Sequence, residues 1–443
     1  MSSPVLRLVL LVSCCHGLVH IYEHSFASVE QLVGQEFGVG KEITGWIGSC
    51  LRLPFGLFAL AAGWMADRWG ARRLLLVYVI GCAFSCLLAW LSPGLVGVFV
   101  AMFLLGTFAG IYHPAGVGWI AQHTQPDNRP LALGYHGILG SAGIAAGPFL
   151  AALVLQTGVG WRSYYLVLGL VGGLLAWLLA MSLPREETDR YPARREGAAS
   201  DSGTSSPAKQ IAPLDGPETV RLGSKRVGNP WPETSAEMTD SWASFWILSG
   251  MTSLAGIVYA AITTFLPRYL NETGLVLPGV SPASMRNYQT GFVLGLGVLG
   301  QYTAGRIGRP RTLEMLIALA LGLAAPCVVW MGFAGGLARL VAAGGFAVLF
   351  FAHQPLYNSA IAKYISGRRR GLAYGVSFTL GFGVGSLGPA IAGQIPKDEL
   401  LYPILGAILV AAALLAALLW WLHRPPPTET GPLPSLSDES ALL

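Results

Sequence analysis

Long apolar stretches separated by short polar connections run along most of this chain. Each has the ~20 predominantly apolar residues that a helix needs to cross a bilayer. In lipid, a helix satisfies its own backbone hydrogen bonds within such a run. The pattern therefore predicts an all-α membrane protein with twelve transmembrane helices, at 6–26, 44–65, 73–92, 95–122, 131–155, 161–183, 242–270, 287–308, 312–332, 335–364, 370–394 and 400–422.

Two polar stretches interrupt this pattern. Residues 184–241 are rich in Gly, Pro, Ser, Arg and Glu, and they have too few apolar side chains to fold alone. We expect a disordered cytoplasmic linker there, between a six-helix bundle at 1–183 and a second at 242–423. The tail at 424–443 begins with a run of prolines and is also predicted to be disordered.

Composition and charge agree with a membrane protein. The chain is 53% hydrophobic and 12% charged, whereas soluble domains average about 25% charged residues. Most of the 28 Lys and Arg lie at the termini or in even-numbered connections, which predicts an inner (plasma) membrane protein with both termini cytoplasmic. The net charge of +5 then reflects topology, and no nucleic-acid partner is expected.

The first apolar stretch has an alternative interpretation as a secretory signal with an apolar region at 6–12. We favour a membrane helix, because the stretch continues through His16, His20 and Glu23. The six cysteines all lie within predicted spans, so neither a disulfide framework nor a metal knuckle is expected.

The two halves of the chain are related in sequence. The small-residue run from Gly140 to Pro148 matches a run from Gly381 to Pro389, and each follows a proline of an earlier segment, Pro114 or Pro355, at the same separation. Small residues let two helix backbones touch, and a proline bends its helix. Such a repeat is typical of secondary transporters built from two similar bundles.

A basic, Gly-rich hinge at 63–73 has a less complete copy at 300–311. With this hinge and the repeat of the two halves, the chain resembles the major facilitator superfamily over its whole length except the linker and the tail. The hinge resembles that superfamily's signature between helices two and three, and Gly143 to Pro148 resembles the helix-five antiporter motif found mostly in exporters. The sequence Tyr112-His113-Pro114 and the polar first helix resemble fosmidomycin-resistance exporters.

Helix four departs from the exporter pattern. It lacks the arginine that many exporters carry ahead of a Gly-rich run, here Phe103 to Gly110. Proton coupling through that arginine therefore does not transfer to this chain.

The resemblance implies a cytoplasmic gate in the hinge. Gly63 would let helices two and eleven pack closely, and Asp67 would pair with a nearby Arg or face the positive N-terminal end of helix eleven. The second copy of the hinge has Gly305 at the position that corresponds to Asp67, so a gate with an acidic residue is expected in the first half only. For Arg72 and Arg73, setting the topology is the alternative role. The gating candidates are Gly63, Asp67, Arg68, Arg72, Arg73, Gly143, Gly147 and Pro148.

The first helix carries an unusual polar stripe. His16, His20, Glu23 and His24 are spaced so that they share one helix face. A charged Glu near mid-bilayer costs about 2.5–3.5 kcal/mol, so the stripe must line a cavity or meet partners. Counting ~1.5 Å per residue places Glu23 and Arg52 at similar depth, which predicts an ion pair.

The same count places His113 and His136 together on helices four and five, and His353 near the middle of helix ten. The stripe has three interpretations. Glu23 carries a proton with histidines as relay; His16, His20 and His24 with Glu23 bind zinc or ferrous iron; or the stripe is structural. Candidates for proton coupling or substrate binding are His16, His20, Glu23, His24, Arg52, His113, His136, Tyr259, Thr263, Gln289, Gln301, His353, Gln354, Asn358 and Ser377.

The sequence thus predicts a secondary transporter with alternating access that exports a small organic molecule in exchange for protons. It has no ATP-binding loop ending in Gly-Lys-Ser/Thr and no convincing nucleophile–base pair, so we expect neither an enzyme nor a bound cofactor. The expected partners are substrate, protons and lipid, with the chain as a monomer. The alternatives are a transition-metal transporter and a transport-inactive receptor or scaffold, against which Asp67 argues.

Overall fold

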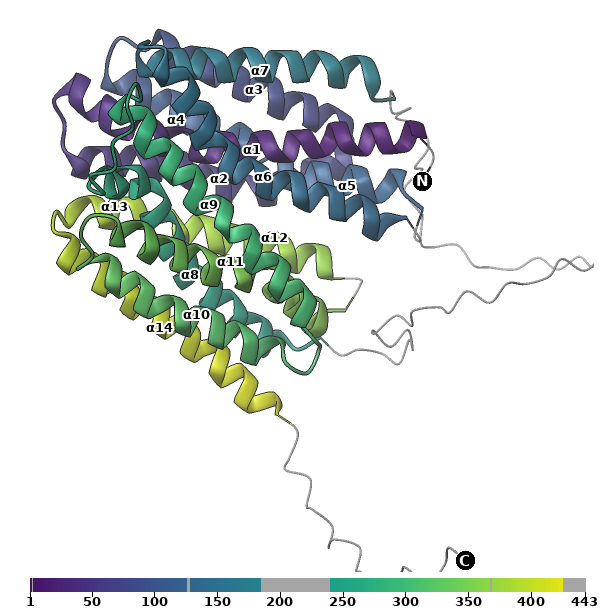
Figure 1. The fold of residues 1–443 in the computed structure, drawn as a ribbon. Coiled ribbons are helices and arrows are strands. Elements are labelled where there is room, and N and C mark those ends of the chain that lie inside the picture. The colour runs from purple at the N-terminus through teal and green to yellow at the C-terminus, as the bar shows by residue number, and fades with distance from the viewer. Residues whose placement is uncertain (2, 126–127, 185–239, 367–368, 425–443) are drawn as a thin grey trace, which may run out of the picture. The chain divides into compact units, whose positions relative to one another are not determined.

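The computed structural model describes residues 1, 3–125, 128–184, 240–366 and 369–424 (Figure 1). The predicted linker at 184–241 and tail at 424–443 lie almost wholly outside the described residues, so their disorder stays a prediction. All the helices belong to one unit, made of Met1–Arg185 and Thr239–Leu443. Within it, buried apolar side chains form two clusters, one in each half of the chain.

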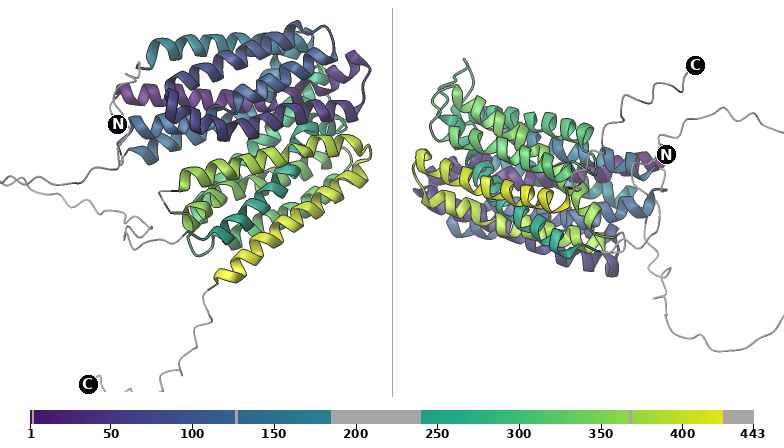
Figure 2. Two further views of the ribbon diagram at one scale, coloured as in Figure 1. Left: turned by 180° about the vertical axis from the view of Figure 1, so that it is seen from behind. Right: turned by 90° about the horizontal axis from the view of Figure 1, so that it is seen from below.

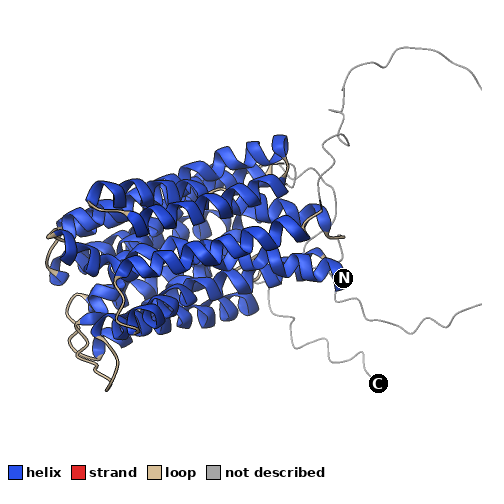
Figure 3. Cartoon of the chain, turned by 90° about the horizontal axis from the view of Figure 1, so that it is seen from above, coloured by secondary structure: helices blue, strands red, loops and turns tan. Residues whose placement is uncertain are grey.

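The described chain is helical throughout, and no strand occurs in it (Figure 3). The helices of the first half are α1 (Ser3–Phe37), α2 (Lys41–Trp69), α3 (Ala71–Leu91), α4 (Leu95–Ala109), α5 (Tyr112–His123), α6 (Arg129–Gln156) and α7 (Trp161–Ser182). Those of the second half are α8 (Trp242–Asn271), α9 (Pro282–Ile307), α10 (Leu313–Met331), α11 (Ala338–Tyr364), α12 (Arg370–Gly385), α13 (Leu387–Gln394) and α14 (Asp398–His423).

Two of the predicted crossings are broken helices, and a proline explains each break. A helical proline removes one backbone donor and clashes with the carbonyl four residues earlier. For Pro114 that carbonyl belongs to Gly110, where α4 gives way to α5. For Pro389 it belongs to Gly385, where α12 gives way to α13. Each pair therefore forms one crossing.

Eleven segments of the described chain are long and apolar enough to cross a membrane. The remaining predicted crossing, α9, has 26 residues but is more polar than the others. Its Arg286, Asn287 and Gln289 are 6%, 0% and 5% exposed. These polar side chains point into the protein, where they avoid the cost of facing lipid.

α1 is longer than predicted. It continues to Phe37, well past the expected end at residue 26, and so adds Glu30 and Glu36 to the helix. Glu30 is 1% exposed. The predicted boundary at residue 26 is therefore wrong, and it cut the helix before its second buried carboxylate.

The small-residue run of each half packs on the first helix of that half. A Cβ on Gly143 of α6 would collide with the backbone of Gly17 in α1. A Cβ on Gly388 of α13 would collide with the backbone of Ile257 in α8. Since no side chain stands between these backbones, the helices approach closely. The repeat in the sequence thus corresponds to a repeated contact.

The start of α1 and the end of α14 lie at the same end of the helices, which we call the terminal end (Figures 1 and 2). The N-terminal amine donates to Asn128 Oδ1 at 3.2 Å. His423, the last residue of α14, lies 3.2 Å from the hydroxyl of Ser244 near the start of α8. We call the opposite end the far end. There Glu30 of α1 accepts a hydrogen bond from Arg268 of α8, so both helices run from the terminal end to the far end.

The two halves meet where α2 packs on α12 and α13 and where α6 packs on α9. A Cβ on Gly45 would lie 2.5 Å from the carbonyl oxygen of Pro389, and one on Gly56 would collide with Gly383. The expectation for Gly63 is wrong for this conformation: the nearest atom to its Cβ position is Pro114 Cβ at 4.0 Å, in the same half.

Candidate functional site

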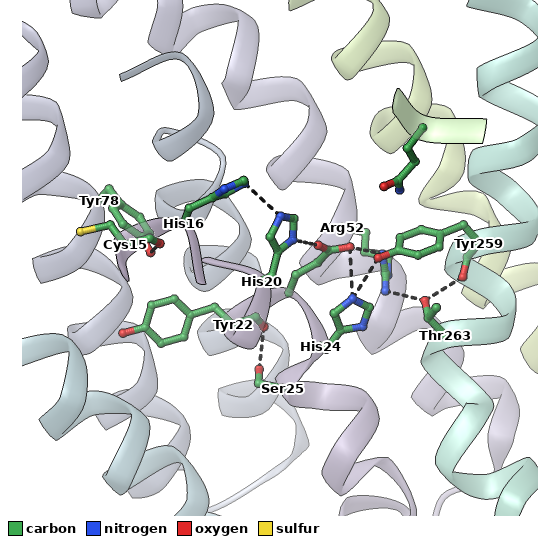
Figure 4. A network of polar contacts seen from close by, with 12 residues as sticks. Cys15, His16, His20, Tyr22, His24, Ser25, Arg52, Tyr78, Tyr259 and Thr263 are labelled. Atoms are coloured by element: carbon green, nitrogen blue, oxygen red, sulfur yellow. Dashed lines mark hydrogen bonds and ion pairs between the residues drawn. The ribbon is translucent and has the colours of Figure 1, made fainter. Parts of the chain in front are cut away.

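The polar stripe of α1 is buried except for the half-buried His20, and the structure links its members into a network (Figure 4). Nδ1 of His20 lies 2.8 Å from Oε2 of Glu23, and Nε2 of His20 lies 3.2 Å from Nε2 of His16. The helix brings these groups together because residues three and four apart are neighbours on one face. Nδ1 of His16 continues the chain to the backbone carbonyl of His136 in α6, at 2.7 Å.

The predicted Glu23–Arg52 ion pair is confirmed. Nη1 of Arg52 donates to Oε1 of Glu23 at 2.8 Å, and Nη2 donates to Oγ1 of Thr263 in α8 at 2.9 Å. Glu23 and Arg52 are each 2% exposed. One guanidinium therefore joins a carboxylate of the first half to a hydroxyl of the second, and each charge has its partner.

His24 belongs to a different part of the network from His16 and His20. Its Nε2 lies 2.9 Å from the hydroxyl of Tyr259 and 3.9 Å from Oε1 of Glu23. In Figure 4, His20 lies between His16 and Arg52, whereas His24 lies beside Tyr259. Of the histidines in the alternative metal set, His16 and His20 lie close together, whereas His24 lies a further turn along α1 and reaches α8.

A histidine cluster surrounds His16 instead. Its ring stacks on His136 of α6 with centroids 3.8 Å apart, and it meets His113 of α5 edge-on at 5.2 Å. One nitrogen from each of His16, His20 and His113 falls within 4.8 Å of the others. A Cβ on Gly140 would collide with the His16 ring. The glycine of the helix-five run thus makes room for the imidazole.

In the second half, some of the polar residues predicted to face substrate lie at the contact between the halves. The ring of Tyr259 lies under Arg52, whose guanidinium carbon is 5.4 Å from its centroid. Gln301 accepts from Ser141 Oγ of α6 at 2.7 Å and donates to Gln354 Oε1 at 2.9 Å. Tyr259, Thr263 and Gln301 therefore lie at the contact between the halves, with Gln354 beside Gln301, and their role in substrate binding stays a prediction.

Other candidates lie away from this contact. Gln289 accepts from Thr273 Oγ1 at 3.0 Å, near the far end. His353 is 4% exposed and bonds the carbonyl of Phe350 on its own helix. Asn358 is exposed, and Ser377 is buried without a hydrogen-bond partner for its hydroxyl among the described residues. Residue type alone did not show which helix face each one occupies.

The hinge residues differ in surroundings. Arg72 donates to the carbonyls of Ala180 and Leu183, each at 3.1 Å, and so caps the C-terminal end of α7. Arg68 lies over the ring of Trp64, at 5.4 Å from its centroid. Arg73 is exposed. The side chain of Asp67 lies outside what the structure describes, so its pairing stays a prediction.

Sequence reasoning missed a polar contact at the far end. Glu30 accepts from Arg268 at 2.7 and 3.1 Å and from Thr44 Oγ1 at 2.5 Å. Asn287 of α9 donates to the carbonyl of Ser28 at 2.9 Å. The signal was present, since Glu30 follows Glu23 by seven residues and so shares its helix face.

The second half also contains a buried carboxylate that was missed. Glu314 of α10 is 2% exposed and accepts from Lys363 Nζ at 2.8 Å and Tyr364 OH at 2.7 Å. The second half therefore has a buried carboxylate in an ion pair of its own. This network lies within one half, so it does not join the two.

Comparison with known proteins identifies the family. The model of the Major Facilitator Superfamily matches residues 12–389. The chain belongs to the Major Facilitator Superfamily. It is therefore a multi-pass membrane transporter of small molecules and not an enzyme. The finer resemblance to fosmidomycin-resistance exporters stays a prediction.

Several characterised relatives are similar in sequence. The gallate transporter of Pseudomonas putida is 27% identical over 85% of this chain and 82% of its own length. The probable sulfoacetate transporter of Cupriavidus necator is 24% identical over 91% of both chains. The puromycin resistance protein of Streptomyces alboniger is 32% identical, but the match spans 35% of this chain and 30% of that protein.

Solved structures share the fold. A D-xylose-proton symporter superposes with a TM-score of 0.68 at 13% identity, over 97% of this chain and 99% of that one. An inward-facing bacterial homologue of the lysosomal transporter Spinster gives a TM-score of 0.63 at 16% identity, over 95% and 97%. At such identities the likeness establishes the fold alone.

Proposed function

We propose that this superfamily member is a proton-coupled secondary transporter of a small organic molecule. The observation that carries the proposal is the buried Glu23–Arg52 ion pair, whose arginine also bonds Thr263 across the contact between the halves. Proton coupling requires a titratable group at the contact between the halves, because the charge of that group then affects how strongly the halves bind each other.

The geometry supplies a physical link between protonation and movement. When Glu23 is ionised, it fixes Arg52, and Arg52 reaches Thr263. A proton on Glu23 would remove the charge that orients Arg52, since the ion pair is stable only while both partners are charged. Protonation would thereby loosen one tie between the bundles and leave the guanidinium free for a substrate. Rocking of the two bundles around this contact is the proposed alternating access.

The comparisons support an organic substrate. The two relatives matched over most of their length carry the names of gallate and sulfoacetate, both organic acids. The puromycin resistance protein matches over a shorter part. The predicted direction, export in exchange for protons, rests on the run from Gly143 to Pro148 and on that shorter match. We retain export as part of the proposal. Transport measured with the pH gradient applied in each direction tests it.

We also propose that the hinge gates the terminal end, that this end faces the cytoplasm of an inner membrane, and that the chain works as a monomer. The basic residues Arg68, Arg72 and Arg73 near this end support the orientation. Asp67→Asn is expected to abolish transport while leaving membrane insertion intact. Normal transport by that variant would remove Asp67 from the gate.

The deciding experiment is transport by purified protein in liposomes with an imposed pH gradient. Labelled gallate, sulfoacetate and puromycin serve as probes, with the gradient applied in each direction. The wild type is expected to move at least one probe faster with the gradient, and Glu23→Gln is expected to lose the gradient dependence. Glu314→Gln is the matched control, because Glu314 is equally buried but lies within one half.

A wild type that transports a probe regardless of the gradient would overturn proton coupling. The transition-metal alternative is tested in the same liposomes with labelled zinc. The hydrogen bond between His24 and Tyr259 argues against its predicted ligand set, which included His24. The scaffold alternative depends on residues 184–241, which lie almost wholly outside the described part of the chain.

A further inference from the structure

We propose that Glu23, His20 and His16 form a proton relay that, in this conformation, holds one proton more than an ionised carboxylate and two neutral imidazoles would carry. The proposal deepens the proposed function by naming where the coupled proton resides. Its role in transport rests on that proposed function, whereas the proton count rests on the hydrogen bonds alone.

The count follows from three consecutive contacts. Glu23 Oε2 lies 2.8 Å from His20 Nδ1, His20 Nε2 lies 3.2 Å from His16 Nε2, and His16 Nδ1 lies 2.7 Å from the carbonyl of His136. Each contact needs one proton between its two atoms. A backbone carbonyl can only accept, so His16 Nδ1 must carry a proton. An ionised Glu23 and two neutral rings supply two protons, and three are required.

The arrangement without the extra proton is unfavourable. His20 Nδ1 would donate to Glu23 and His16 Nδ1 to the carbonyl, which leaves an unprotonated Nε2 on each ring. Two nitrogen lone pairs would then face each other at 3.2 Å, between the buried His16 and the half-buried His20. Buried polar atoms are normally paired, because an unpaired one costs about 1–3 kcal/mol. Loss of the proton is therefore expected to rotate one ring away.

The surroundings favour His20 as the site of the extra proton. Arg52 donates to the other oxygen of Glu23 at 2.8 Å, which favours the ionised carboxylate and hence an imidazolium at His20. Placing the proton on Glu23, with His20 turned to its other tautomer, gives the same count. The titratable and charged groups that face the relay are Arg52 from α2, Tyr112 and His113 from α5, His136 from α6, and Tyr259 from α8 through His24 and Arg52.

The relay has a direction and an exit. It runs along α1 from the contact between the halves toward the terminal end. Nε2 of His113 and of His136 are buried without a hydrogen-bond partner among the described residues, and nitrogens of His113, His16 and His20 lie within 4.8 Å of one another. A proton that leaves His20 would break one N–H bond there and form one on a ring nitrogen of His113, once the two rings have moved into hydrogen-bond distance. The ring of His113 packs on Phe378 of α12 at 4.6 Å, so movement of the second half would change the exit.

Nitrogen NMR of histidine-labelled protein in lipid tests the count directly. At neutral pH we expect His20 to be an imidazolium, with both ring nitrogens protonated, and His16 to be a neutral ring protonated at Nδ1. The imidazolium signal should be lost in His20→Gln and displaced in His16→Gln. His123→Gln is the control, because His123 lies at the terminal end and bonds the carbonyl of Trp119 instead; it should leave the signal unchanged.

Two results would overturn the relay. The first is a wild-type spectrum with two neutral rings beside an ionised Glu23, read from its carboxyl carbon. The second is a stoichiometric metal in the purified protein, measured by mass spectrometry, since a metal ion would then occupy the place of the proton. If the His20 variant fails to fold, the displacement of the imidazolium signal in His16→Gln carries the test, and an unchanged signal in that variant would overturn the relay.

The outcomes for the relay and for the proposed function are separate. An imidazolium in a protein whose transport ignores the pH gradient would keep the relay and remove the coupling. Gradient-driven transport without an excess proton on the relay would keep the coupling and assign the proton elsewhere.

Discussion

Glu30 of α1 accepts two hydrogen bonds from Arg268 of α8, at 2.7 and 3.1 Å, and this pair ties the two halves together at the far end. Glu30 is 1% exposed and also accepts from Thr44 at 2.5 Å. A buried carboxylate with three charge-assisted or hydroxyl donors is well satisfied. The contact therefore stabilises the conformation in which α1 and α8 are joined at the far end.

Glu30→Gln is expected to favour opening at the far end, because an amide keeps one acceptor but loses the charge. Hydrogen bonds to charged groups contribute about 1.5–3 kcal/mol, and each 1.4 kcal/mol is a tenfold change in an equilibrium. The open population should rise by about tenfold or more. A cysteine at Ser28, which is buried beside Asn287, would report it through faster reaction with an impermeant maleimide.

The control for this variant is Glu36→Gln. Glu36 also pairs with an arginine, Arg162 at 2.6 Å, but within the first half. Unchanged labelling in Glu30→Gln, or equal acceleration in both variants, would mean that the Glu30–Arg268 pair does not hold the far end.

Arg52→Lys is expected to abolish coupled transport although the charge is kept. The guanidinium bonds Glu23 and Thr263 through two different nitrogens, at 2.8 and 2.9 Å, and the single ammonium group of lysine does not reproduce that fork. The measurement is transport in liposomes with and without a pH gradient. Wild-type rates and gradient dependence in this variant would show that the bridge is dispensable.

Gly143→Ala is expected to destabilise the protein by about 1–3 kcal/mol, because overpacking a close helix contact forces backbone shifts. The new Cβ would collide with Gly17 of α1. Gly137→Ala on the same helix has nothing within 4 Å and should be neutral or stabilising by up to about 1 kcal/mol. Thermal unfolding of both variants in detergent checks the pair, and equal midpoints would exclude the close α1–α6 contact.

Asp240 predicts a local pH dependence at the terminal end. The backbone N–H of Ser366 at 2.8 Å, and then Arg369 at 3.0 Å, lower the pKa of its carboxyl below the usual 3.8. Since the folded pKa lies below the unfolded one, the contact contributes stability above pH 3.8 that is lost as the pH falls through the folded value. Hydrogen exchange of the Ser366 amide, corrected for intrinsic rate, should show this loss.

Asp240→Asn provides the comparison for this measurement. The amide oxygen can still accept from Ser366, but it cannot titrate, so protection of that amide should lose its acid dependence. A dependence that persists in the variant would assign the effect to another group.

Part of the site was predictable because it is local to one helix. Spacing along α1 placed His16, His20 and Glu23 on one face, and a depth count along two helices gave the ion pair with Arg52. The same reasoning failed for His24, whose position one residue after Glu23 turns it toward Tyr259. It also missed Glu30, because hydropathy ends a helix where polar residues begin, whereas α1 continues to Phe37.

The sequence by itself determined the order of the membrane crossings, the repeat of the two halves and the polar character of the first helix. These follow from apolar run length and residue spacing, which are properties of neighbouring residues. Tertiary structure decided which helices meet at each polar group: Arg52 with Thr263, Glu30 with Arg268, and His16 with His136. Those contacts depend on how helices far apart in sequence rotate and pack, and no local pattern encodes that rotation.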